Sequence, residues 1–144
     1  MITKISHANL WVLNKDDAKS FYRDKLGFEV VQDVTMEGFR WLTMAPKGSE
    51  VPFTMLEPGP PMLDDESTAA LRTLLQKGAM SGGVLETDDC RATFEELSAR
   101  GVTFLQEPAE RPYGVEAVFR DDSGNWFSLT ESFHALTEQR QPGV

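Results

Sequence analysis

The chain has 144 residues, and its formal net charge of −9 makes it acidic. The length fits one domain with a sizeable core, and 40% hydrophobic residues indicate a folded chain rather than a disordered one. The acidic balance disfavours nucleic acid, which is bound through Lys and Arg, and it disfavours anionic membrane surfaces. No apolar run is long enough to cross a bilayer. The single cysteine, Cys90, excludes an internal disulfide framework and favours a reducing, cytoplasmic setting.

The first half of the chain alternates between strand and helix patterns. Side chains alternate with a period of two along residues 4–12, a pattern that predicts a strand. Asn14 or Asp16 can cap the helix that follows, and Gly27 ends it. Further strands are expected over residues 28–34, 39–44 and 52–57.

The second half repeats this order of elements. A strand is expected over residues 83–87, a helix from Asp88 to Gly101, and three more strands over residues 102–105, 115–120 and 125–131. The repeat predicts two tandem strand-helix-strand-strand-strand modules in a single α+β domain. Together they would form a curved, eight-stranded mixed sheet with a concave site and with helices outside.

The repeat also predicts boundaries within this single domain. Module one covers about residues 4–57, and module two covers about residues 81–131. A connecting segment of about residues 58–80 begins with a proline-rich breaker and carries an amphipathic helix. Residues 132–144 are predicted to be a C-terminal tail.

A short phrase recurs at the end of each half. Residues 53–57 read FTMLE, and residues 127–131 read FSLTE. Because strand side chains alternate, each glutamate shares a face with the phenylalanine of its phrase. A carboxylate on an apolar strand face carries a desolvation cost that needs an explanation. Glu57 and Glu131, at equivalent places in the two halves, are therefore candidate site residues.

Several local phrases resemble the vicinal oxygen chelate superfamily, which includes glyoxalase I, extradiol dioxygenases and bleomycin-binding resistance proteins. In the first half they are HANLWV at residues 7–12, DDA at residues 16–18 and LGF at residues 26–28. In the second half they are RGV at residues 100–102 and FRDDSGN at residues 119–125. The resemblance covers nearly the whole chain and implies the two-module fold.

The resemblance also implies a set of metal ligands. In metal-dependent members the ligands come from the first and last strands of each half, and His7, Glu57 and Glu131 match three of these four places. Residues 79–83 offer no histidine or carboxylate for the fourth place. One imidazole and two carboxylates suit a divalent metal such as nickel, zinc, manganese or iron. The implied function is a metal-dependent lyase, isomerase or oxygenase acting on a small oxygen-bearing molecule, with Glu131 as general base.

A metal-free binding protein is the alternative that the missing fourth ligand favours. Bleomycin-binding relatives sequester a drug without metal, and Trp11, Phe53, Met55 and Phe127 are expected to line such a hollow here. Trp41 could face either side of its strand. Acidic residues at the rim would attract a cationic ligand. For either function the resemblance implies a homodimer and a small-molecule partner. A scaffold role has no feature in its favour beyond the connecting helix.

Overall fold

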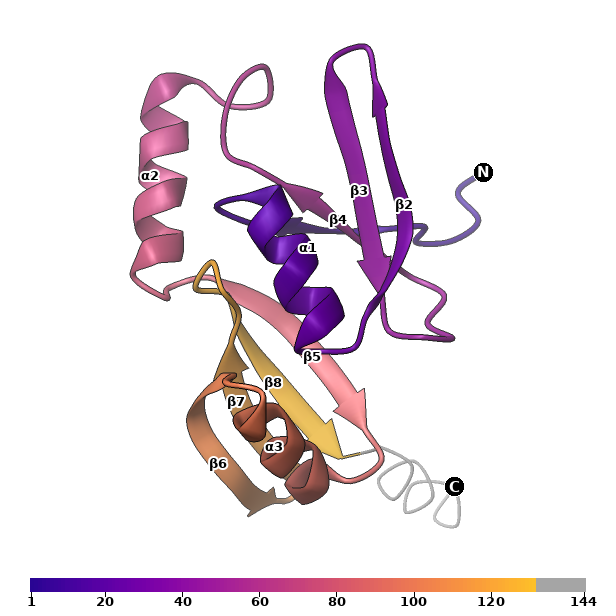
Figure 1. Ribbon diagram of the computed structural model, residues 1–144, viewed down its shortest axis with the longest axis vertical. Helices are drawn as coiled ribbons and strands as arrows, with labels where there is room; N and C mark the ends of the chain where they lie inside the picture. The colour runs from indigo at the N-terminus through magenta and orange to yellow at the C-terminus, as the bar shows by residue number, and fades with distance from the viewer. Residues whose placement is uncertain (132–144) are drawn as a thin grey trace. The chain divides into compact units, whose positions relative to one another are not determined.

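The two halves of the chain fold into the same order of elements. The computed structural model describes residues 1–131, which Figure 1 shows as two successive βαβββ modules joined by a helix. The first half contains β1 (Ala8–Trp11), α1 (Lys15–Asp24), β2 (Glu29–Met36), β3 (Phe39–Ala45) and β4 (Phe53–Leu56). The connecting helix α2 (Asp65–Gln76) precedes β5 (Ser81–Thr87), α3 (Cys90–Ala99), β6 (Thr103–Arg111), β7 (Gly114–Arg120) and β8 (Trp126–Glu131). The predicted order of elements is confirmed.

Each half forms its own four-stranded sheet. The strand orders are β1-β4-β3-β2 and β5-β8-β7-β6, and in both sheets the first and last strands of the half pair in parallel. The predicted curved, eight-stranded sheet is not confirmed as a single sheet, since no described strand of one half pairs with a strand of the other. The α+β class and the two modules are confirmed. In each module the sheet consists of a parallel pair, formed by the first and last strands, and a hairpin formed by the other two.

The chain divides into two compact units. The first contains Met1–Met80 together with the turn Asp122–Gly124, and the second contains Ser81–Asp121 and, among the described residues, 125–131. The predicted C-terminal tail, residues 132–144, lies outside the described residues. Within residues 1–131, no helix is both long and apolar enough to span a membrane.

Each helix begins at a polar residue that caps it. The side chains of Asn14, Asp64 and Asp89 accept hydrogen bonds from the backbone N–H three residues later, at 2.9, 2.7 and 3.0 Å. Such caps satisfy N–H groups that have no partner inside the helix. Of the two caps considered for the first helix, Asn14 is the one used, and Asp16 lies in the first turn.

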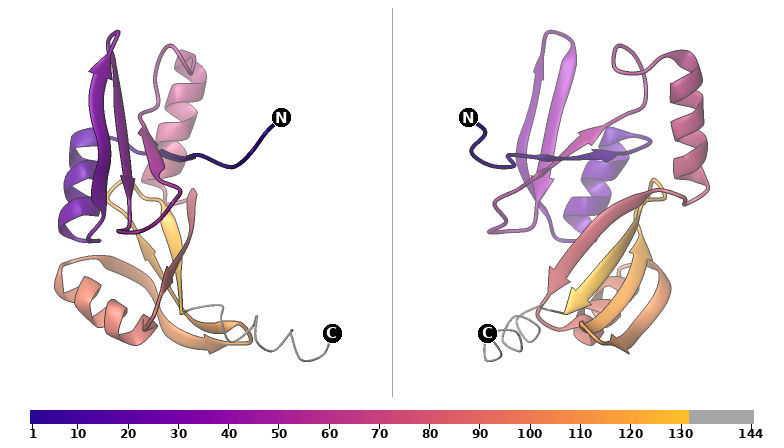
Figure 2. Two further views of the ribbon diagram at one scale, coloured as in Figure 1. Left: turned by 90° about the vertical axis from the view of Figure 1, so that its right-hand side faces the viewer. Right: turned by 180° about the vertical axis from the view of Figure 1, so that it is seen from behind.

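The β2–β3 hairpin extends beyond the paired strands β1 and β4, as Figure 2 shows. β3 pairs with β4 only through Thr43 and Met44, whereas its pairing with β2 continues to Phe39 at the hairpin tip. Among residues 1–131, the outer part of the hairpin therefore has no strand paired to its β3 edge, and that edge is open.

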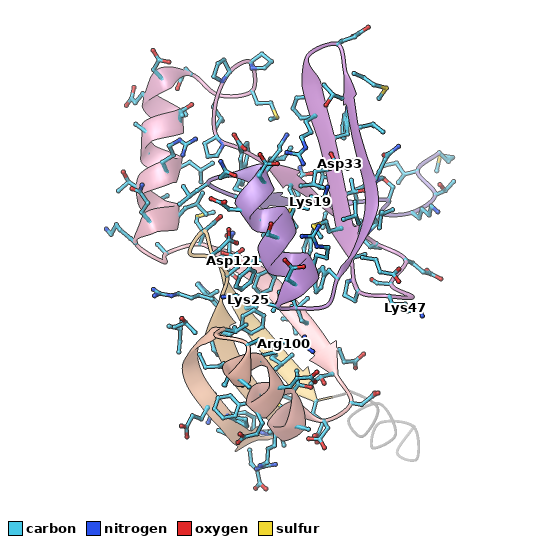
Figure 3. The ribbon with its side chains drawn as sticks, in the orientation of Figure 1. Lys19, Lys25, Asp33, Lys47, Arg100 and Asp121 are labelled. Carbon is cyan, nitrogen blue, oxygen red and sulfur yellow. The ribbon has the colours of Figure 1, made fainter. Side chains whose placement is uncertain are left out.

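One face of the hairpin is fixed to α1 by charged side chains. The Asp33 carboxylate accepts hydrogen bonds from Lys19 Nζ at 2.8 Å and from Arg40 Nε at 2.9 Å. Lys19 and Asp33 are labelled in Figure 3, where helix and hairpin bring them close together. The hydrogen bonds from Arg40, and then from Lys19, hold the pKa of Asp33 well below its usual range. These contacts set the position of the hairpin within the first unit.

Candidate functional site

The twin glutamates occupy equivalent positions and make the same contact. Glu57 Oε1 accepts a hydrogen bond from the backbone N–H of Lys15 at 2.7 Å, and Glu131 Oε1 accepts one from that of Cys90 at 3.3 Å. Lys15 and Cys90 are the first residues of α1 and α3. The first N–H groups of a helix lack intrahelical partners and carry the positive end of the helix dipole. This contact offsets the desolvation cost of a carboxylate on an apolar strand face.

Replacing Glu57 with alanine is expected to lower the free energy of unfolding by about 1–2 kcal/mol, because the Lys15 N–H loses a charged acceptor. Glu57→Gln keeps an acceptor oxygen and should recover about half of that loss. The Glu131→Ala loss should be smaller, since its hydrogen bond is longer. Urea unfolding of the four proteins measures the differences. Equal midpoints for wild type and Glu57→Ala would show that the contact contributes nothing.

His7 and Glu57 do not converge within the first unit. β1 and β4 pair in parallel, with Ala8 opposite Phe53 and Trp11 opposite Leu56. His7 precedes this ladder and Glu57 follows it, so five residue steps, about 16 Å, separate them along the strands. They also lie on opposite faces, because side chains alternate. Two ligands of one metal ion each lie about 2.0–2.2 Å from it, so these two residues do not fit one shared ion.

The remaining candidate ligands are no better arranged for a metal. His7 is exposed, and its Nδ1 lies 3.1 Å from Ser6 Oγ. Glu131 belongs to the second unit and contacts the start of α3. In the stretch 79–83, a Cβ at Gly82 would lie 2.2 Å from Cζ of Phe127. Over residues 1–131, no three His, Cys, Asp or Glu side chains gather closely enough to hold a metal ion.

Three of the four predicted ligand-contacting residues pack inside their own units. Phe53 stacks on Phe28, with ring centroids 6.5 Å apart, and Met55 is fully buried. Phe127 is also fully buried and stacks on Phe119 at 5.5 Å. These three side chains lie on the same strand faces as the twin glutamates, which are the faces toward the helices. Trp11 lies on the opposite face and is half-buried.

A hollow of about 830 Å³ opens on the first unit. It is bounded by the β2–β3 hairpin, by β1 and β4, and by the segment that precedes α2. Asn9 and Thr54 are register partners on neighbouring strands, so they share this face of the sheet. The lining residues are Asn9, Met36, Glu37, Phe39, Trp41, Thr54, Leu56, Pro61 and Met62. None of the residues that the sequence assigned to ligand binding is among them.

The wall of the hollow is aromatic and apolar. Phe39 and Trp41 meet edge to face, with ring centroids 5.2 Å apart and an interplanar angle of 70°. Trp41 is 41% exposed, Met36 is 56% exposed and Met62 is 46% exposed, although all three are large hydrophobic side chains. Exposed apolar side chains gathered around a concavity are typical of a binding site.

Lys15 anchors the aromatic wall from the side of α1. Its ammonium donates a hydrogen bond to the Arg40 carbonyl oxygen at 2.7 Å and lies 4.3 Å from the centre of the Phe39 ring. Burial lowers the pKa of Lys15, while the nearby Glu57 carboxylate acts in the opposite direction. One residue therefore ties the helix start to Glu57, just after β4, through its N–H and to the hairpin through its side chain.

The sequence offered a partial signal for this site. The sequence places Trp41 on a strand without deciding which face it occupies, and in the structure it lines the hollow. Met36 and Phe39 flank a two-residue turn, which places them opposite one another on one face. Reading the hairpin across its turn would have gathered both side chains with Trp41. Nothing in the sequence places Pro61 and Met62 beside them, because that contact depends on the path of the connecting segment.

The corresponding sheet face of the second unit is polar. Glu116 accepts hydrogen bonds from Ser128 Oγ at 2.5 Å and from the Tyr113 hydroxyl at 2.8 Å, and Ser128 also pairs with Thr130 at 2.9 Å. The bond from Ser128 holds the pKa of the Glu116 carboxyl below its ordinary value, and the same carboxylate raises the pKa of Tyr113. The two sheets thus share a fold, but this face of the second sheet carries hydrogen-bonded polar side chains where the first carries the apolar hollow.

Comparisons with known proteins agree with the architecture. Residues 4–129 match the model of the Glyoxalase/Bleomycin resistance protein/Dioxygenase superfamily. The uncharacterised protein YetH of Bacillus subtilis (strain 168) is 30% identical over 132 residues, which cover 91% of this chain and all of YetH.

Two solved structures are also similar. The crystal structure of UcmS2 is 53% identical, with a TM-score of 0.87 over 92% of this chain and all of that one. TnmS3, an antibiotic binding protein from Streptomyces sp. CB03234, is 29% identical, with a TM-score of 0.72 over 90% of this chain and 96% of that one. The chain belongs to the glyoxalase, bleomycin resistance protein and dioxygenase superfamily.

Proposed function

We propose that this protein binds and sequesters a flat, largely apolar small molecule in the hollow of its first unit. The observation that carries this proposal is the exposed aromatic wall of Phe39 and Trp41. Aromatic rings at a concave surface bury a large area and select for planar partners, since rings stack or meet edge to face. Met36 and Met62 add flexible, polarizable contacts that adapt to the outline of a ligand.

The size and composition of the hollow support binding. Its volume of about 830 Å³ lies within the range of sites that hold drug-sized molecules, roughly 300–1,000 Å³. Asn9 and Thr54 can supply hydrogen bonds at the floor, while most of the lining is apolar. Such a lining binds by excluding water and orients the ligand through a few polar groups.

The same lining offers little for catalysis. Glu37 is its single titratable side chain, and it lies at the rim. General acid–base chemistry requires a proton donor or acceptor within hydrogen-bond reach of the reacting atoms, commonly with a second group that orients it. The similarity to TnmS3, an antibiotic binding protein, supports binding as the role of the family member described here.

Titration with acridine, an uncharged planar tricycle, tests the proposed function. Protein purified without a metal-affinity step, treated with EDTA and then dialysed free of it, is expected to bind one acridine per hollow, as measured by calorimetry. The affinity should be the same before and after addition of nickel, zinc, manganese or iron. Binding that appears only after a metal is added would contradict the proposal. It would instead favour a metal-dependent lyase, isomerase or oxygenase.

A further inference from the structure

We infer that Glu37 selects ligands that carry a positive charge at the edge of their planar body. This inference rests on the proposed function and assigns a class of ligand to the same hollow. Glu37 lines the rim where the β2–β3 hairpin turns, and it is the one charged side chain of the lining. All the other lining residues are neutral, so this carboxylate is the one charge that the lining itself presents to a ligand.

The backbone at Glu37 departs from the local preference of its residue type. Glu37 has φ of 51° and Gly38 has φ of 79°, so both central residues of the two-residue turn are left-handed. Such turns favour glycine, asparagine or aspartate, because other side chains crowd the backbone in this conformation. Glu37 is the one non-glycine residue with positive φ among residues 1–131. A strained residue at the rim of a binding hollow points to a role in binding.

The Glu37 carboxylate is available to a ligand. Within the part of the chain that the structure describes, it makes no hydrogen bond or ion pair. The nearby hairpin charges are already paired, since Arg40 contacts Asp16 and Asp33 on the face toward α1. The paired strands and the turn fix the position of Glu37, so a ligand does not have to order a flexible loop.

The geometry at the rim selects one arrangement of ligand. A planar body against Phe39 and Trp41 would lie beside Glu37, since all three residues line the same hollow. An ammonium or ring N–H⁺ at the edge of such a body would gain a charge-assisted hydrogen bond and a cation–π contact with the rings. A carboxylate or phosphate at the same edge would be repelled by Glu37, and the net charge of −9 would add to this repulsion.

Two probes and two variants test the charge preference. 9-Aminoacridine is a planar cation at neutral pH, and acridine is its uncharged counterpart. Glu37→Gln removes the charge and keeps a side chain of the same size on the same turn. Glu29→Gln is the matched control, because Glu29 is an exposed glutamate on β2 outside the lining. Each protein is titrated with each probe by calorimetry at low and at high salt.

Glu37→Gln is expected to weaken the binding of 9-aminoacridine by about threefold to fivefold, the loss typical of an exposed ion pair. Its affinity for acridine should be unchanged. Glu29→Gln should change neither affinity, and high salt should reduce the preference of the wild type. Equal 9-aminoacridine affinities for wild type and Glu37→Gln, with acridine still bound, would overturn this inference and leave the proposed function standing. Binding of neither probe to the wild type would overturn both.

Discussion

Replacing Gly82 with alanine is expected to lower the free energy of unfolding by about 2–3 kcal/mol, the cost of overpacking a filled core. A Cβ at this position would lie 2.2 Å from Cζ of Phe127 and 2.6 Å from two further atoms of the ring. The ring has no room to withdraw, because Phe127 is fully buried and stacks on Phe119 at 5.5 Å. Urea unfolding followed by far-ultraviolet circular dichroism measures the loss.

Gly59→Ala is the matched control for this prediction. A Cβ at Gly59 meets nothing within 4 Å, and the residue does not have a positive φ. The free energy of unfolding of Gly59→Ala should lie within about 0.5 kcal/mol of the wild-type value. A Gly82→Ala protein as stable as the Gly59→Ala protein would contradict the packing described for Phe127. Gly82 lies in the stretch where the resemblance expects a fourth metal ligand, and packing explains why a residue without a side chain stands there.

Replacing Trp41 with alanine is expected to weaken acridine binding by about tenfold to thirtyfold, the loss typical of a central aromatic contact. The substitution removes the larger ring of the aromatic wall and leaves Phe39 without its edge-to-face partner. Stability should change little, because the Trp41 side chain is already 41% exposed. Calorimetric titration gives the affinity, and a thermal melt of the same sample checks the fold.

Trp126→Ala controls for the general effect of removing a surface tryptophan. Trp126 is 36% exposed on β8 of the second unit and is not part of the lining. Its removal should leave the acridine affinity unchanged. If Trp126→Ala weakens binding as much as Trp41→Ala does, the ligand does not bind where we propose. If neither substitution weakens acridine binding, Trp41 makes no contribution to it.

The sequence predicts the fold well because the signals for it are local. Capping residues such as Asn14, strand alternation and the stops at Gly27 and Gly101 act within a few residues, and the repeat of the two halves confirms their order. The one part of the predicted fold that is not confirmed is the joining of all eight strands in a single sheet. Whether eight strands join into one sheet or two depends on pairing between the halves, and residue patterns within a strand do not determine that pairing.

The site was harder to predict. The alternation of side chains along a strand shows which residues share a face, but it does not show which face a helix covers. Phe53, Met55 and Glu57 do share a face, as their spacing indicates, but α1 covers it. The intervening Thr54 and Leu56 face the hollow. Both faces of β4 carry apolar residues, so composition could not decide between them. The equivalence of Glu57 and Glu131 was visible in the sequence, whereas their shared contact with a helix start was not.

The indole signals of the three tryptophans test the location of the site most directly. In the ¹⁵N-labelled protein kept in EDTA, each indole N–H gives one resonance, assigned through single Trp→Phe variants. During an acridine titration the Trp41 resonance is expected to shift progressively to saturation, while the Trp126 resonance stays in place. A shift of Trp126 with Trp41 unmoved, or no shift at all at saturating acridine, would contradict a binding site in the hollow of the first unit.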